Sequence, residues 1–100
     1  MQTIEIDGSS WSDRLDFWYA LRDALGVVPE HGTGFDAFED SVFYHPDMLN
    51  IQPPFKVVVR NPSPMVISDV EQMAEGWVLQ RQWRKERYGD DVEASISLVQ

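Results

Sequence analysis

A short run at residues 55–59, FKVVV, limits what this chain can fold into more than any other stretch. It is rich in β-branched residues and lacks a strict alternation of polar and apolar positions. That pattern is typical of a strand buried on both faces of a parallel sheet. Residues 3–6 and 92–98 do alternate, and we expect them to form two further strands. The chain is therefore predicted to contain a small sheet with residues 55–59 at its centre.

Helical patterns fill the sequence between these strands. Ser10 is predicted to cap a first helix that ends at Gly26 and buries apolar residues spaced three and four apart: Trp11, Leu15, Trp18, Leu21 and Leu25. Ser68 and Glu71 have capping-box spacing and predict a last helix that runs toward Tyr88 and ends at Gly89. Its buried positions are Val70, Met73 and Trp77. Residues 44–54 contain three prolines and no clear period, so we expect an irregular connection with at most a single helical turn.

The order of these elements predicts the fold class. Strands separated by helices imply parallel crossover connections, hence an α/β fold with a small parallel sheet of about three strands packed with helices. The chain has 100 residues, of which 43% are hydrophobic. That is enough for one core and too short for two, so residues 1–100 are expected to form a single domain.

A second helix is predicted in an acidic segment, because five acidic residues and no Lys or Arg lie between positions 30 and 47. Thr33 and Asp36 have capping-box spacing, which places the helix from there to about Phe43. One face then carries apolar side chains for burial: Phe35, Phe38 and Val42. The opposite face carries Asp36, Glu39, Asp40 and Phe43. This face is suited to contact something basic.

Each residue on that face also has a purely structural interpretation. Asp36 could serve only the helix start, where the macrodipole favours an acidic side chain. Asp40 is harder to explain in this way, because a like charge four residues after Asp36 costs about 0.2–0.5 kcal/mol. Phe43 is either an exposed aromatic anchor or is covered by the loop that follows Tyr44. Both interpretations of Phe43 stay open at the level of sequence.

The charge distribution excludes some classes of partner. The net charge is -9, and residues 1–50 hold ten acidic side chains against two basic ones. Such a field repels nucleic acid and membrane surfaces and attracts a basic protein. Arg81, Arg84, Lys85 and Arg87 surround Trp83 in a pattern also found in nucleic-acid-binding proteins, but cations near a helix C-terminus equally offset its dipole. There is no cysteine, signal peptide or membrane-spanning run, so we expect a cytoplasmic protein.

Motif and element order together resemble the barstar family of intracellular ribonuclease inhibitors. The resemblance rests on the strand ending in Ile6-Asp7-Gly8, the helix after it, Pro29, and Gly32-Thr-Gly-Phe-Asp36-Ala37-Phe38-Glu-Asp40. It is good over residues 3–42 and weaker beyond. The chain differs from the family pattern at His31, which replaces an aromatic pair, and at Gly34, which replaces Asn. Glu39 occupies a position that is aromatic in the best-known member of the family.

The resemblance implies a protein inhibitor without catalytic activity, cofactor or metal, and a monomer when free. Its acidic helix would mimic phosphates in the active site of a basic, barnase-type ribonuclease or toxin. The implied partner-binding residues are Glu30, His31, Gly32, Asp36, Glu39, Asp40 and Phe43. Two alternatives remain: an interaction module of the same fold whose basic partner is not a nuclease, and a metal site built from His31, Asp36, Asp40, His45 and Asp47.

Overall fold

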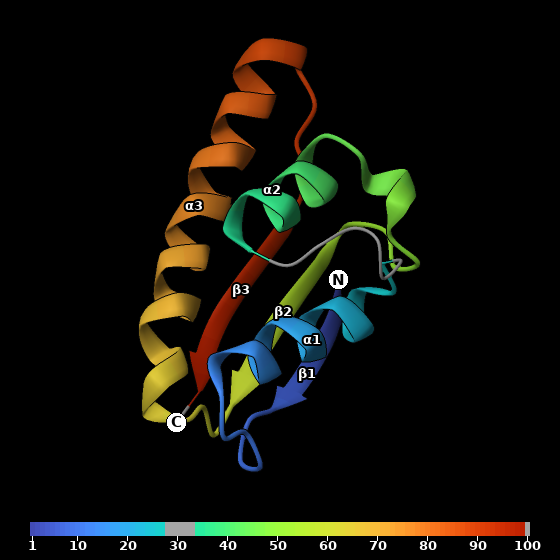
Figure 1. Cartoon of the computed structure of the whole chain (residues 1–100). Helices are drawn as coiled ribbons and strands as arrows, with labels where there is room; N and C mark the ends of the chain where they lie inside the picture. The colour runs from blue at the N-terminus through green and yellow to red at the C-terminus, as the bar shows by residue number, and fades with distance from the viewer. Residues whose placement is uncertain (28–33, 100) are drawn as a thin grey trace.

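The computed structural model describes residues 1–27 and 34–99, and it confirms the predicted order of elements (Figure 1). The strands are β1 (Gln2–Asp7), β2 (Phe55–Arg60) and β3 (Ala94–Val99). The α-helices are α1 (Arg14–Leu25), α2 (Phe35–Phe43) and α3 (Pro64–Tyr88). The short 3-10 helix η2 (Pro46–Met48) is the single turn expected in the proline-containing connection.

The sheet is parallel throughout, as the sequence predicts. Its strand order is β1-β2-β3, with β2 in the middle. Ile4 of β1 is level with Val57 of β2, which is level with Ile96 of β3. This register places apolar side chains of all three strands on one face. The α/β fold with a three-stranded parallel sheet is therefore confirmed.

The helices cover one face of that sheet, and the core lies between them (Figure 1). Phe55, Val57 and Val59 point into this core and are fully buried. Three side chains from α3, namely Val70, Met73 and Trp77, meet them there and are fully buried too. The predicted buried stripe of the last helix is thus confirmed.

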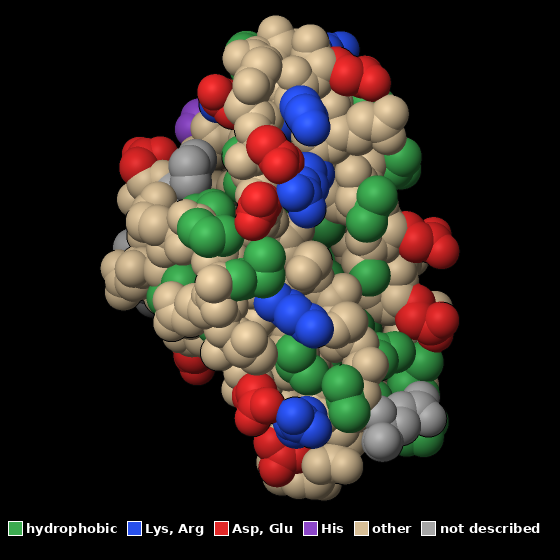
Figure 2. Space-filling view, turned by 180° about the vertical axis from the view of Figure 1, so that it is seen from behind, with side chains coloured by type: hydrophobic (Ala, Val, Ile, Leu, Met, Phe, Trp, Pro, Cys, Tyr) green, Lys and Arg blue, Asp and Glu red, His purple; other side chains and the backbone are tan. Residues whose placement is uncertain are grey.

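The reverse face of the sheet is open, which corrects the expectation that residues 55–59 are buried on both faces. Lys56 and Arg60 alternate with the core residues of β2 and are exposed. Arg60 donates a hydrogen bond from Nη2 to Glu5 Oε1 at 2.8 Å. Figure 2 shows basic side chains following one another along this side of the molecule. Among the described residues of the three strands, Val58 alone is buried on this face. The lack of alternation at positions 57–59 therefore does not indicate a second covering layer.

The helix starts differ from the predicted ones, although the ends agree. Helix α1 is capped by Asp13, which forms a capping box with Asp16, and not by Ser10. Its buried face consequently centres on Phe17, Trp18 and Leu21, and Leu15 is 47% exposed. Gly26 and Gly89 end α1 and α3 in the left-handed conformation, with φ angles of 71° and 77°. Glycine adopts this conformation without steric cost. The two helices therefore end at the glycines that the sequence predicts.

Helix α3 begins one turn before the predicted Ser68. Pro64 is its first residue and Ser63 is the N-cap. Proline suits this position because its φ is already helical and the first turn needs no N–H donor. Asp69, which the predicted capping box would have placed near a helix start, instead accepts two hydrogen bonds from Arg14 of α1, at 2.8 and 2.9 Å.

This bidentate pair fixes α1 against α3, and its two partners are unequally buried. The Asp69 side chain is 7% exposed, whereas that of Arg14 is 61% exposed. We therefore expect Arg14→Met to lower the urea midpoint more than Asp69→Asn does, because only the first leaves a buried carboxylate unpaired. A buried charged group without partners typically costs more than about 1–3 kcal/mol. Equal losses in the two variants would show that the pair behaves as an ordinary surface ion pair.

The basic residues near the end of α3 contact the acidic residues that follow the helix. Arg81 donates from Nε and Nη2 to the two carboxylate oxygens of Asp91, at 2.6 and 2.9 Å. Arg84 donates to Asp90 at 3.1 Å and lies 4.5 Å from the centre of the Tyr88 ring. Charge balance is therefore the better interpretation of these two arginines. Within the described residues, no helix combines the length and apolar character needed to cross a membrane.

Candidate functional site

Helix α2 is held from two sides by aromatic side chains. Trp18 of α1 packs edge-on against Phe35, with ring centres 5.0 Å apart, and is stacked on Phe38 at 5.9 Å. At the other end of α2, Phe43 meets Trp77 of α3 edge-on at 6.0 Å. Phe38 and Val42 are fully buried, which confirms the predicted apolar face. These contacts fix which side of α2 faces outward.

The start of α2 differs from the prediction. Its N-cap is Gly34, which makes no side-chain capping bond and has a φ of 142° and a ψ of 171°. That backbone conformation is essentially restricted to glycine, which gives a physical reason for Gly34 at this position. Asp36 is the second residue of the helix, and the expected capping box pairs it with Thr33. Thr33 itself lies outside the described residues.

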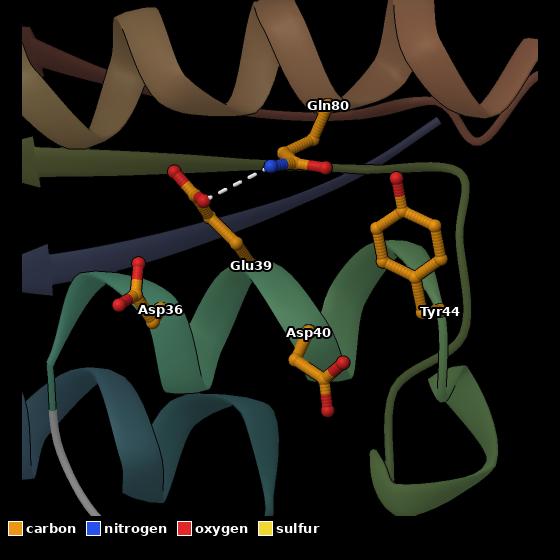
Figure 3. A pocket seen from close by; sticks show the side chains of 5 residues that line it. All are labelled: Asp36, Glu39, Asp40, Tyr44 and Gln80. Atoms are coloured by element: carbon orange, nitrogen blue, oxygen red, sulfur yellow. Dashed lines mark hydrogen bonds between the residues drawn. The ribbon is translucent and has the colours of Figure 1, made fainter.

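The outward side of α2 borders a small hollow between α2 and α3, which we call the α2–α3 hollow (Figure 3). Its volume is about 190 Å³, and its lining consists of Asp36, Glu39, Asp40, Tyr44 and Gln80. Asp36 and Asp40 are exposed. They lie one helical turn apart, where side chains are neighbours. Figure 3 shows that Glu39 points across to α3, while Asp40 points away from it.

Glu39 has the most specific environment of the three carboxylates. Its Oε2 accepts a hydrogen bond from Gln80 Nε2 at 3.2 Å. Partial burial raises the pKa of Glu39, and the nearby Asp36 carboxylate adds to the rise, although the hydrogen bond from Gln80 opposes it. The carboxylate is therefore charged at neutral pH at some cost to the folded state.

This cost gives a prediction with a defined sign. Because the folded pKa of Glu39 lies above its usual value of 4.5, the folded state binds this proton more tightly than the unfolded state. The resulting stabilisation is present below pH 4.5 and is lost as the pH rises through the folded pKa. We expect Glu39→Gln to be more stable than the wild type at pH 7. That advantage should shrink toward pH 4.5, as measured by urea melts of both proteins. An advantage that does not vary with pH would contradict this assignment.

Asp40 is near the imidazole of His45, with Oδ2 and Nε2 3.8 Å apart. Both side chains are largely exposed, at 61% and 57%. Such a pair contributes little to stability because water solvates both groups. The alternative role as metal-ion ligands was predicted for His31, Asp36, Asp40, His45 and Asp47, of which His31 lies outside the described residues. Among residues 1–27 and 34–99, no group of three or more His, Asp or Glu side chains is placed to hold a metal ion.

Among the implied partner-binding residues that the structure describes, Phe43 is the one whose placement corrects the prediction. It is fully buried, so it offers no exposed aromatic anchor. Trp77 of α3 packs edge-on against it. Glu30, His31 and Gly32 lie outside the described residues, so their predicted contacts with a partner are not placed.

Two residues of the hollow were absent from the predicted site. Tyr44 is the C-cap of α2, and its position directly after the acidic helix was an available signal. Gln80 belongs to α3, 41 positions after Glu39, and no local pattern in the sequence connects the two. Asp36, Glu39 and Asp40 are therefore the predicted site residues that the structure brings together. No known family model and no curated protein matches this chain.

Proposed function

We propose that this chain is a barstar-like inhibitor that blocks the active site of a basic ribonuclease or related toxin. The observation that carries the proposal is the way in which α2 is packed on one side and exposes acidic side chains on the other. Its aromatic side packs against Trp18 and Trp77, and its outer side exposes Asp36 and Asp40 one turn apart. The three-stranded parallel sheet and the element order agree with the family that the sequence resembles.

The proposed mechanism is mimicry of a polyanion by fixed carboxylates. A ribonuclease binds RNA phosphates through Arg, Lys and His side chains, and these would make charge-assisted hydrogen bonds to Asp36 and Asp40. Because α2 is already ordered, little conformational entropy would be lost on binding. The acidic N-terminal half would speed the encounter, and added salt would slow it. The chain would act as a cytoplasmic monomer without performing chemistry.

The test begins with the partner itself. The chain is used as bait in cytoplasmic extract from its own source, and the captured protein is identified and purified. We expect a basic protein that cleaves RNA, with activity that falls to zero at one equivalent of added inhibitor. RNA cleavage by the purified chain alone would contradict the proposal, as would a captured ribonuclease that stays active in the complex.

A second candidate is an interaction module of the same fold whose basic partner is not a nuclease. The observation that favours it is the position of the aromatic side chains of α2. The phenylalanines of α2 pack inward, and the position that is aromatic in the best-known member of the barstar family carries the half-buried Glu39. A captured basic protein that binds at the α2–α3 hollow and has no ribonuclease activity would favour this candidate.

A further inference from the structure

Gly76 occupies a position in α3 where glycine needs an explanation. It lies in the interior of a 25-residue helix, where glycine is less favourable than alanine. Its side faces Glu39 of α2. A Cβ added at position 76 would overlap Glu39 Oε1 and lie 3.4 Å from Glu39 Cδ. The carboxylate of Glu39 therefore occupies the space that any other residue at position 76 would fill.

Gln80 completes this arrangement one turn farther along α3. Its Nε2 donates to Glu39 Oε2 at 3.2 Å, while Oε1 of Glu39 lies over Gly76. Both carboxylate oxygens thus face α3. The arrangement places a negative charge in a half-buried site beside Asp36, which does not favour folding. Stability alone does not account for it.

The consequence concerns the shape of the acidic surface. With Glu39 turned against α3, the α2–α3 hollow stays open between Asp36, Asp40 and Tyr44 (Figure 3). If Glu39 instead pointed outward, its side chain would lie at this opening. We propose that Gly76 and Gln80 are positioning residues: by holding Glu39 against α3, they keep the hollow open for one basic side chain of the partner. This inference rests on the proposed function. It makes two residues of α3 determinants of which partner the hollow accepts.

The first measurement needs no partner. Gly76→Ala should fold, because alanine favours the helix and the displaced atoms belong to the flexible end of Glu39. The pKa of the Glu39 carboxyl should then fall toward its ordinary value, as followed by carboxyl-carbon NMR during a pH titration. Gln72→Ala, another substitution to alanine on the exposed side of α3, serves as the matched control and should leave this pKa unchanged.

The second measurement uses the captured partner. Gly76→Ala leaves the net charge unchanged, so the association rate constant should stay within about twofold of the wild type. Dissociation should be at least about tenfold faster, because Glu39 now obstructs the hollow. Adding Glu39→Ala to the Gly76→Ala background removes the obstructing side chain and should recover part of the lost affinity.

The outcomes separate this inference from the proposed function. An unchanged Glu39 titration in Gly76→Ala would overturn the positioning role. An unchanged dissociation rate in Gly76→Ala would overturn the positioning role as well. If Asp40→Ala nevertheless lost affinity, the proposed function would stand without the positioning role. If Asp40→Ala kept wild-type affinity, the proposed function would fail and the positioning role would fall with it. The NMR titration would then report only a structural contact between Gly76 and Glu39.

Discussion

Phe43→Ala is expected to destabilise the fold by about 3–5 kcal/mol, a typical cost for removing a buried aromatic side chain. Phe43 is fully buried and meets Trp77 edge-on at 6.0 Å, so the substitution would leave a cavity between α2 and α3. Small domains have total stabilities of about 5–15 kcal/mol, so much of the available stability would be lost. Urea unfolding followed by tryptophan fluorescence measures this effect directly.

Two further variants make the Phe43 experiment decisive. Phe43→Leu keeps most of the apolar volume and should cost clearly less than Phe43→Ala. Trp83→Ala removes an aromatic ring that is 49% exposed, and it should change stability little. If Phe43→Ala melted like the wild type and only weakened partner binding, Phe43 would be the surface anchor that the structure excludes.

Asp40→Ala is expected to weaken partner binding by several kcal/mol, the second large effect. Close charge pairs across a protein interface have coupling energies of about 1.5–7 kcal/mol, and loss of one partner mainly increases the dissociation rate. Folding stability should stay the same or rise by a few tenths of a kcal/mol, because the repulsion between Asp40 and Asp36 is removed. Binding kinetics at two salt concentrations, together with urea melts, test both expectations.

Asp47→Ala is the matched control for Asp40→Ala. Asp47 is exposed in η2 and does not line the α2–α3 hollow, yet its removal changes the net charge equally. Both variants should slow association slightly through the weaker overall field, and only Asp40→Ala should increase dissociation strongly. Asp36→Ala should also increase dissociation, and its stability should change little because Asp36 is exposed. Wild-type affinity in Asp40→Ala would mean that this face of α2 is only a solvated surface.

The candidate site could be predicted from the sequence in part. Spacing alone placed Asp36 and Asp40 on one side of a helix, since a helix of 3.6 residues per turn fixes which side chains are neighbours. Spacing also placed Phe43 on that side, and this prediction was wrong. A side chain at the margin of a helix face is covered or exposed according to which elements pack next to it. The contact of Glu39 with Gly76 and Gln80 depends on the path of α3, which local periodicity does not encode.

Three features could be predicted from the sequence alone: the parallel three-stranded sheet, the central position of residues 55–59, and the ends of α1 and α3. These features follow from local chemistry: β-branched runs favour strands, helices between strands require parallel crossovers, and Gly26 and Gly89 adopt the left-handed conformation that ends a helix. Three others became visible only in the folded chain: the open reverse face of the sheet, the burial of Phe43 and the position of Glu39. Each of these depends on contacts between residues far apart in the chain, and burial is set by those neighbours.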